Sequence, residues 1–462
     1  MWVKNKSRAS QEPRLQGWKM PPPLAEFEQK LHKATSSDDD QSLPNVAVIA
    51  ADSNGRILTS ISSGTYIPRA TIDKSNGSGV NIEPAAEKFT ADTICWIASC
   101  TKLMTSVSAM QLVERGLLNL DDDIAQTVLP ELKGIQILTK MTDEGPILRP
   151  AKNKITLRNL LTHSSGLSYE FTHPKMFAWK QWSIQQAKKN KAKSQSSDPA
   201  YWAPFKTRSV DPAVAYLVPL LFEPGEGWTY GYGIDWVGVA VSRVSGLSLG
   251  EYMQKNIWTP LGMTSTTFHL ENRPDLIPRL ASMSTRNDEG KLEPAGTGGP
   301  MDPFRLGVKE SGGGGAFSTA NDYIKFLIAV LQNNGKLFQS RDTLPYMMSP
   351  HLKDPAHLAA IHANPMSYGL AGNLPQDTKL DYALGGITNL TAVSTTGRAE
   401  GSMQWSGLPN LFWWINPKDG ICGCYFGQIL PPGDVPSFLM YEEFEKAVNA
   451  SFVKGKAVKG KL

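Results

Sequence analysis

The sequence predicts an α+β protein in which both ends of the chain form one antiparallel sheet and mostly helical segments lie between them. Three observations lead to this fold class. One hairpin pattern occurs early in the chain, a second occurs late, and a long apolar stretch without Pro or Gly runs from Trp96 to Arg115. The chain has 462 residues, of which 41% are hydrophobic, so it can bury a large core.

The early hairpin follows a segment that we expect to pack poorly. Residues 1–40 are polar, contain several prolines and close on an acidic run, which predicts a polar leader with ordered structure beginning near Asn45. The strand-like segments VAVIA at 46–50 and ILTS at 57–60 then flank Asn54 and Gly55. Because Asn-Gly tolerates the positive φ angles of a tight turn, this pattern predicts a β-hairpin.

The stretch from Trp96 to Arg115 predicts a buried helix, which should end at Gly116 in a left-handed cap. Near the end of the chain, the apolar runs 412–415 and 421–426 flank a turn over Asn416–Gly420 and predict the second hairpin.

Composition excludes several classes of function. The net charge of +4 with scattered lysines gives no argument for nucleic acid, and no apolar run has the length that a bilayer requires. The cysteines have spacings of neither a disulfide framework nor a zinc site, so we expect reduced thiols and neither metal nor cofactor. We therefore expect a cytoplasmic protein. The ending Gly460–Leu462 approximates a peroxisomal signal but lacks its small first residue.

Ser99 and Lys102 carry the first chemical signal. They fall three residues apart at the start of the predicted helix, so their side chains should share one face. A serine hydroxyl needs a neighbouring base to become a nucleophile, and a buried lysine can be that base. The pair alone is weak evidence, because a helix-starting serine followed by an exposed lysine fits the same spacing.

Several further segments resemble, in the same order along the chain, the motifs of the serine β-lactamase-like superfamily. This superfamily includes class C β-lactamases, DD-peptidases and family VIII carboxylesterases. The resemblance covers about residues 45–445 and implies an α/β sandwich of the β-lactamase/DD-peptidase type. The matching segments are Ser99-x-x-Lys102, ITLRNLLTHSSGL at 155–167, PGEGWTYGY at 224–232, PLGMTST at 260–266, GGAFSTAND at 314–322 and WSGL at 405–408.

This resemblance implies a role for each matching residue. Ser99 would be the acylated nucleophile, Lys102 would exchange its proton, and Tyr230 would be the second base. The backbone N–H groups of Ser99 and Leu408 would form the oxyanion hole. For Tyr230 the alternative is a buried core aromatic. His163, within the second motif, is expected to be structural because lysine and tyrosine already fill the base roles.

Two departures from the family pattern bear on the substrate. Tyr232 replaces the family's asparagine, and Trp405 replaces the lysine that meets a carboxylate. Losing both polar anchors argues against β-lactams and cell-wall peptides and favours a neutral, apolar ester or thioester. Tyr232 is therefore a candidate for substrate contact, together with Trp405, Ser406 and Gly407.

Within the superfamily, YGYGIDWVG at 230–238 and WSGLPNLFW at 405–413 look like the fungal polyketide acyltransferases of statin-type pathways. That resemblance implies transfer of an acyl group from a small thioester or a carrier protein of a polyketide synthase to a hydroxyl of a hydrophobic metabolite. A carboxylesterase remains the near alternative, because water and alcohol differ only in how the pocket admits them. The third hypothesis is that the protein is a non-catalytic scaffold of the same fold.

The segment 169–202 is the expected specificity device. Its aromatic residues include Tyr169, Phe171 and Trp179, which we predict to roof the substrate pocket, with ordinary core packing as the alternative. The basic stretch Lys188–Lys193 is expected to be an exposed loop that contacts an acidic carrier protein, or else a merely solvated one.

The domain prediction is a leader over 1–40, one catalytic domain over 41–450 and a basic tail over 451–462. Within the catalytic domain we expect a sheet subdomain at about 41–120 and 290–450, and a mostly helical lid subdomain at about 121–289. The glycine run 312–315 is expected to be a backbone turn that borders the active site, because it lacks the lysine of a phosphate-binding loop.

Overall fold

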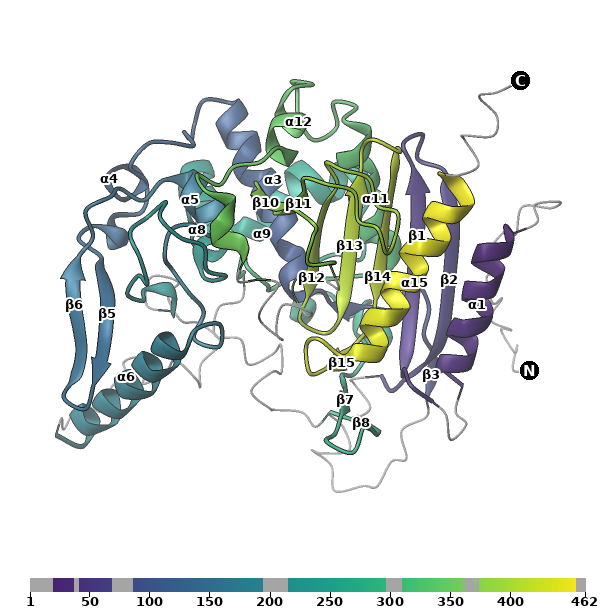
Figure 1. The fold of residues 1–462 in the computed structure, drawn as a ribbon, viewed down its shortest axis with the longest axis horizontal. Helices are drawn as coiled ribbons and strands as arrows, with labels where there is room; N and C mark the ends of the chain where they lie inside the picture. Colours follow the sequence, from purple (N-terminus) through teal and green to yellow (C-terminus); the bar gives the residue numbers. More distant parts are fainter. Residues whose placement is uncertain are drawn as a thin grey trace, which may run out of the picture.

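The computed structural model describes residues 20–36, 41–68, 86–193, 215–295, 310–359, 361, 370 and 374–453. Among these residues, an eight-stranded antiparallel sheet has the order β10-β11-β12-β13-β14-β1-β2-β3 (Figure 1). The strands are β1 Asn45–Asp52, β2 Ile57–Tyr66, β3 Glu87–Lys88, β10 Leu380–Ala383, β11 Gly386–Asn389, β12 Met403–Gly407, β13 Leu411–Asn416 and β14 Ile421–Phe426. Because β1 pairs with β14, both ends of the chain share the sheet, which confirms the predicted α+β fold class.

Both predicted hairpins are present in this sheet. β1 pairs with β2, with Val48 opposite Ile61, and Gly55 in their connection has a φ of 82°. β13 pairs with β14, with Trp413 opposite Cys424. Strands β1, β13 and β14 are buried along almost their whole length because helices cover both faces of the sheet.

Helices α1 (Pro22–Ala34) and α15 (Val435–Phe452) cover one face and pack against each other (Figure 1). Ordered structure therefore begins well before Asn45, and the prediction of a poorly packed leader over 1–40 is wrong for this helix. Its apolar residues Leu24, Phe27 and Leu31 recur every three or four positions and are buried. Two of the prolines that suggested disorder, Pro22 and Pro23, stand in the first helical turn, where the missing N–H costs nothing.

Helices α3 (Thr101–Glu114) and α11 (Ala320–Gln332) lie on the other face, and α11 packs on β1 and β14. α3 is buried at every position from Thr101 to Leu112. It ends as predicted at Gly116, which has a φ of 69° and whose N–H donates to the Val113 carbonyl at 2.9 Å. The next N–H, of Leu117, donates to the Leu112 carbonyl, which completes a Schellman cap.

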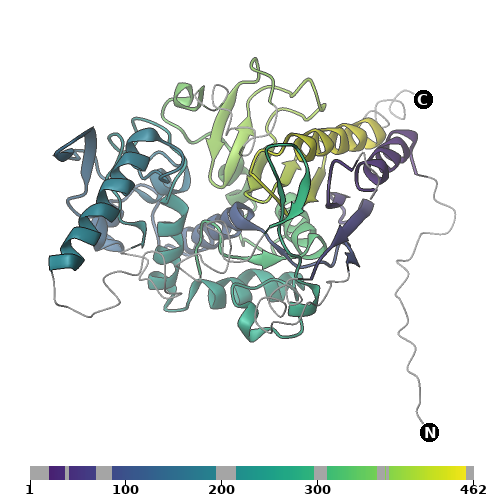
Figure 2. The ribbon, with the colours of Figure 1, turned by 90° about the horizontal axis from the view of Figure 1, so that it is seen from below.

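The region predicted as mostly helical extends from the end of the molecule away from α1 toward its middle (Figure 2). Its helices are α4 Ile124–Thr127, α5 Leu157–Leu161, α6 Pro174–Lys193, α8 Gly233–Ser245, α9 Leu249–Met253 and α10 Thr259–Leu261. It also contains a hairpin that the sequence analysis missed, β5 (Gln136–Thr142) and β6 (Gly145–Pro150), against which α6 packs. The basic stretch 188–193 is the end of α6 and not a loop, although Lys188 and Lys189 are exposed as expected.

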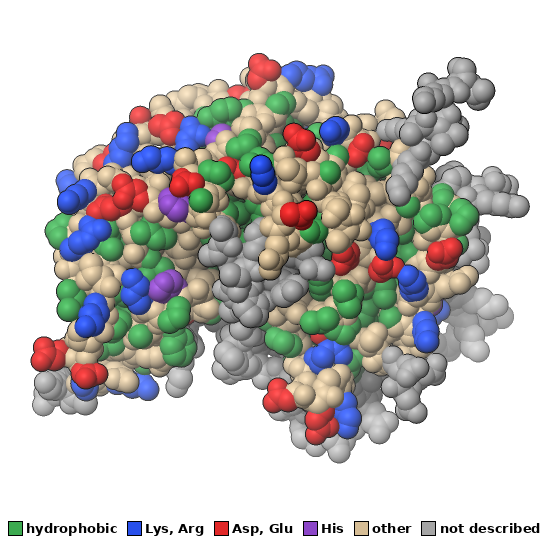
Figure 3. Space-filling model, in the orientation of Figure 1, with side chains coloured by type: hydrophobic (Ala, Val, Ile, Leu, Met, Phe, Trp, Pro, Cys, Tyr) green, Lys and Arg blue, Asp and Glu red, His purple; other side chains and the backbone are tan. Residues whose placement is uncertain are grey.

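Smaller elements complete the described fold. They are β4 Cys95–Trp96, β9 Phe317–Ser318, β7 Ser284–Arg286, β8 Leu292–Pro294, β15 Ile429–Leu430 and α12 Thr343–Met348, with the short helical turns η1 Ala98–Cys100, η2 Pro130–Leu132, η4 Gln254–Trp258, η5 Leu270–Asn272, η6 Ile277–Arg279 and η8 Pro355–Ala359. Within the described part of the chain, none of the helices has the length and apolar character of a membrane span. Basic and acidic side chains are interspersed over the described part of the face in Figure 3.

Candidate active site

Ser99 lies at a sharp connection between a short strand and the buried helix α3. β4 pairs with β9, and the chain then turns through η1, which contains Ser99, directly into α3. Ser99 therefore precedes the helix instead of lying in its first turn as predicted. Ala98 has a φ of 42°, a left-handed conformation that costs roughly 1–3 kcal/mol for a residue other than glycine. Such backbone strain concentrates at functional sites.

Lys102 is buried, with 1% of its surface exposed, and its amine has three hydrogen-bonding neighbours. The Nζ atom lies 3.2 Å from Ser99 Oγ, 3.2 Å from the Tyr169 hydroxyl and 2.6 Å from the Gly313 carbonyl oxygen. The spacing of three residues has thus brought serine and lysine into contact as predicted. The predicted backbone turn at 312–315 borders this amine.

Tyr230 reaches the same serine from a distant part of the chain. Its hydroxyl donates to Ser99 Oγ at 2.6 Å, and its ring centroid lies 4.7 Å from Lys102 Nζ. The ring is buried between His163, with centroids 4.9 Å apart, and Trp405, at 5.2 Å. The structure therefore brings together the three residues that the sequence analysis selected, while the exchange of protons among them stays a prediction.

Asp235 is the site residue that the sequence analysis missed. This carboxylate, 3% exposed in the first turn of α8, accepts hydrogen bonds from the Tyr169 hydroxyl at 2.7 Å, the Ser311 hydroxyl at 2.5 Å and the Gly313 N–H at 3.0 Å. Two of those partners also contact Lys102. An acidic residue inside the apolar run at 233–241 was the available signal, because a buried carboxylate requires partners.

The residues predicted to line the pocket around Tyr169 have different surroundings. The Tyr232 hydroxyl donates to Glu170 at 2.7 Å, and its ring lies 4.5 Å from that of Tyr169. Phe171 stacks on Tyr169 and is 46% exposed. Trp179 lies half-buried on α6 and packs against the core. The other aromatic residues of the segment 169–202 are Phe177, which is 55% exposed, Trp182, which is partly buried, and Tyr201 and Trp202, which lie outside the described residues.

The predicted residues on strand β12 adjoin the site more closely. Trp405 is buried, with its ring against Tyr230 and 5.4 Å from Tyr382. The Ser406 hydroxyl donates to the Leu370 carbonyl at 3.1 Å. A Cβ atom at Gly407 would lie 2.5 Å from the carbonyl oxygen of Ile97, so only glycine lets the strand approach the turn that holds Ser99.

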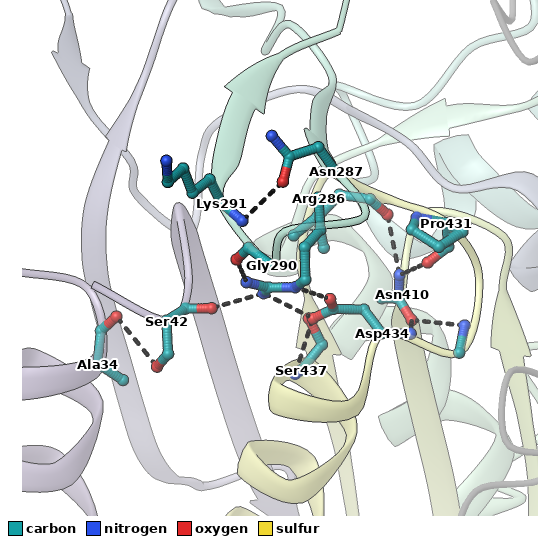
Figure 4. A network of polar contacts seen from close by, with 12 residues as sticks. Ala34, Ser42, Arg286, Asn287, Gly290, Lys291, Asn410, Pro431, Asp434 and Ser437 are labelled. Atoms are coloured by element: carbon teal, nitrogen blue, oxygen red, sulfur yellow. Dashed lines mark hydrogen bonds and ion pairs between the residues drawn. The ribbon is translucent and has the colours of Figure 1, made fainter. Parts of the chain in front are cut away.

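Leu408, the second predicted oxyanion donor, stands in the turn between β12 and β13. Asn410 in the same turn has a φ of 60°. Its side chain holds the turn by four hydrogen bonds (Figure 4): Nδ2 donates to the carbonyls of Ile429 and Pro431, and Oδ1 accepts from the N–H groups of Gly433 and Asp434. The turn that carries the Leu408 N–H is therefore fixed, while its role as an oxyanion donor stays a prediction.

Similarity to known proteins identifies the family of this chain. Residues 26–438 match the family model described as Beta-lactamase. The chain belongs to this beta-lactamase family. It is 33% identical over 445 residues to monacolin J acid methylbutanoyltransferase of Aspergillus terreus, covering 94% of this chain and 97% of the relative. It is also 36% identical over 366 residues to lovastatin esterase of Penicillium rubens, covering 78% and 86% of the two chains.

A solved structure of the same family agrees with these relatives. Unliganded simvastatin synthase from Aspergillus terreus superposes with a TM-score of 0.78 at 30% identity, covering 94% of this chain and 99% of that chain. These matches confirm the predicted resemblance to the β-lactamase-like superfamily and, within it, to fungal statin-pathway acyltransferases. The chain is an enzyme of this superfamily.

Proposed function

We propose that this enzyme is a serine acyltransferase that moves an acyl group from a thioester to a hydroxyl of a hydrophobic small molecule. The observation that carries the proposal is the position of Ser99 Oγ, which lies within hydrogen-bonding distance of both Lys102 Nζ and the Tyr230 hydroxyl. A nucleophile with two proton-transfer groups in contact has the parts that covalent acyl transfer needs. The relatives named as acyltransferases support the same reading.

In the first half-reaction, Ser99 Oγ attacks the carbonyl carbon of the thioester as its proton passes to the Lys102 amine. The C–S bond then breaks, and the proton leaves with the thiolate as a thiol. The backbone N–H groups of Ser99 and Leu408 would stabilise the negative oxygen of the tetrahedral intermediate. The product is an ester on Ser99.

In the second half-reaction, the acceptor hydroxyl attacks that ester. Tyr230, which touches Ser99 Oγ at 2.6 Å, is placed to give its own proton to the neutral Lys102 amine and then, as a phenolate, to take the acceptor's proton as the new C–O bond forms. The bond between the acyl carbon and Ser99 Oγ then breaks, and Tyr230 returns that proton to the serine oxygen. The nearby Lys102 ammonium would stabilise the phenolate. Aromatic side chains of Tyr232 and Trp405, in place of polar anchors, suit a neutral and apolar acyl chain.

A carrier protein is a proposed source of the acyl group. Lys188 and Lys189 are exposed at the end of α6, a position from which basic side chains suit an acidic partner. Replacing both by alanine should slow turnover of a carrier-bound donor and spare a small thioester. Equal loss with the two donors would reject the docking proposal.

Intact-protein mass spectrometry after incubation with a methylbutanoyl thioester tests the acyl-enzyme. The wild-type protein should gain the mass of one acyl group, and Ser99→Ala should gain none. Ser108→Ala is the matched control, because Ser108 is buried on the same helix and bonds only to the carbonyl of Met104 among the described contacts, at 2.9 Å. It should keep the adduct.

Product analysis then separates transfer from hydrolysis. The esterase alternative is favoured by the relative named lovastatin esterase. With a hydrophobic alcohol present, an acyltransferase yields the new ester, whereas an esterase yields mainly the free acid. Absence of an adduct with any activated ester or thioester would contradict both enzymatic readings and favour a scaffold.

A further inference from the structure

The Asp235 carboxylate contacts the Tyr169 hydroxyl, and the Tyr169 hydroxyl in turn contacts the Lys102 amine. The three hydrogen-bond partners of the carboxylate include the N–H of Gly313, which can only donate. The Tyr169 and Ser311 hydroxyls lie at 2.7 Å and 2.5 Å. An ionised carboxylate accepts from all three at once, so the Tyr169 hydrogen points toward Asp235 and away from Lys102.

The state of Tyr169 follows from its surroundings. Burial first, and then the Asp235 carboxylate, raise the pKa of Tyr169 well above its usual value, so the phenol keeps its proton at neutral pH. Because that proton is directed to Asp235, only a lone pair of the phenolic oxygen faces Lys102. The carbonyl of Gly313 likewise can only accept. Two of the three neighbours of the Lys102 amine are therefore restricted to accepting hydrogen bonds.

We propose that Asp235 is a positioning residue that, acting through Tyr169, aims the lone pair of the neutral Lys102 amine at the hydroxyl of Ser99. This inference rests on the proposed function. A neutral amine has two N–H groups and one lone pair. Tyr169 and Gly313 take the two N–H groups, and Ser99 is the neighbour left to donate.

The same arrangement suits the state after proton transfer. Once Lys102 has taken the proton from Ser99, it donates to the serine oxygen, the Tyr169 oxygen and the Gly313 carbonyl without any of them rotating. Fixed dipoles that need no rearrangement during a reaction lower its barrier. Asp235 thus contributes without touching the substrate.

Several titratable groups surround the amine and enter its pH dependence. Among the described residues they come from four elements or loops and comprise Cys100, His163, Tyr169, Tyr230 and Asp235. Of these, Asp235 carries a carboxylate, and removing a negative charge disfavours the protonated forms of its neighbours.

Asp235→Asn tests the proposal by reversing one hydrogen bond. The Gly313 N–H still needs an acceptor, so the new amide oxygen should stay there and the amide NH2 should face Tyr169. Tyr169 would then donate to Lys102 and compete with Ser99 for the lone pair. We expect the acylation rate constant with a p-nitrophenyl ester to fall about 10- to 100-fold with little change in KM. The acidic limb of the pH–rate profile should move to lower pH.

A double-mutant cycle separates this role from a structural one. If Asp235 acts through Tyr169, Asp235→Asn should cost much less in a Tyr169→Phe background than in the wild type. Asp322→Asn is the matched control, because Asp322 is also 3% exposed but lies in the first turn of α11, where its carboxylate accepts from the Ser265 N–H and pairs with Lys325. It should change stability without moving the pH–rate profile.

The outcomes distinguish this inference from the proposed function. If Ser99→Ala still releases nitrophenol at the wild-type rate, the proposed function fails. If Ser99→Ala is inactive while Asp235→Asn keeps the wild-type rate and acidic limb, or if the two substitutions are additive, the positioning role alone is overturned. If Asp235→Asn does not fold, Tyr169→Phe decides, since an unchanged acylation rate for that variant overturns the role as well.

Discussion

At the scale of single residues, His163 shows how a buried titratable side chain next to a reacting group can serve packing. Its backbone has a φ of 56°, its carbonyl accepts from the N–H of Thr229 at 3.0 Å, and its ring packs on that of Tyr230. Burial first, and then the charge of Lys102, lower the pKa of His163 well below its usual value. We therefore interpret it as a neutral side chain that fixes the Tyr230 loop.

This environment predicts a pH dependence of stability. The folded protein keeps His163 neutral, whereas in the unfolded chain this histidine takes a proton as the pH falls below its ordinary pKa of about 6.5. Its contribution to stability is therefore present above that pH and lost below it, by up to about 1.4 kcal/mol per pH unit.

The test compares the wild type with His163→Asn, because asparagine tolerates the left-handed backbone. Denaturant unfolding at two pH values should show the stability advantage of the wild type shrinking by about 2 kcal/mol between pH 7 and pH 5. An advantage of constant size would mean that His163 protonates equally in both states.

At the scale of elements, the site depends on how two connections are held. η1 presents Ser99, and the turn after β12 presents Leu408. Gly407 lets these two connections touch, and Asn410 fixes the second one. Near the same turn, Arg286 bonds to the carboxylate of Asp434, the residue that caps α15, and thereby joins β7 to that helix (Figure 4).

Asn410→Gly removes the side chain but keeps the backbone conformation, because glycine also adopts a positive φ. The variant loses four hydrogen bonds, so we expect a loss of about 2–4 kcal/mol in the free energy of unfolding. If the Leu408 N–H is an oxyanion donor, kcat should fall as well. Thermal and denaturant unfolding, together with steady-state kinetics, would measure both effects.

Asn333→Gly provides the comparison for this prediction. Asn333 also has a positive φ, of 45°, and its side chain donates one hydrogen bond, to the Arg341 carbonyl. It should lose less than about 1.5 kcal/mol and keep its kcat. Similar losses in the two variants would show that the hydrogen bonds of Asn410 add nothing beyond an ordinary turn.

At the scale of the whole molecule, the sheet separates two helical layers with different tasks. α3 carries Lys102 on one face, and α1 and α15 close the opposite face. Phe27 of α1 is 2% exposed, and its ring lies 5.3 Å from that of Phe444 in α15. The buried ion pair of Arg398 and Glu445 ties α15 to the loop before β12.

Phe27→Ala should therefore destabilise the fold without changing the chemistry. Removing this buried ring should cost about 3–5 kcal/mol in the free energy of unfolding, while kcat below the melting transition stays unchanged. Phe177→Ala is the control, because Phe177 is 55% exposed and its loss should stay within about 0.5 kcal/mol. Equal stability of the two variants would indicate that α1 is dispensable to the core.

Features that depend on residues close together in the chain could be predicted from the sequence, whereas contacts between distant residues could not. Strand-like segments on either side of a glycine-containing turn predicted both hairpins, and an uninterrupted apolar stretch ending at Gly116 predicted α3, because these signals lie within a few residues of one another. Ser99 and Lys102 could be paired for the same reason. Tyr230 and the β12 residues were found through motifs, since 131 positions separate that tyrosine from Ser99 and local physics does not connect them.

By itself, then, the sequence determined the fold class, the contact between Ser99 and Lys102, and the family to which the chain belongs. Only the tertiary structure decided that α1 packs against α15, that the Tyr169 oxygen lies 3.2 Å from the Lys102 amine, and that the Tyr169 hydroxyl donates to Asp235. The physical reason is that the direction of a hydrogen bond and the burial of a carboxylate depend on groups that folding brings together from distant parts of the chain.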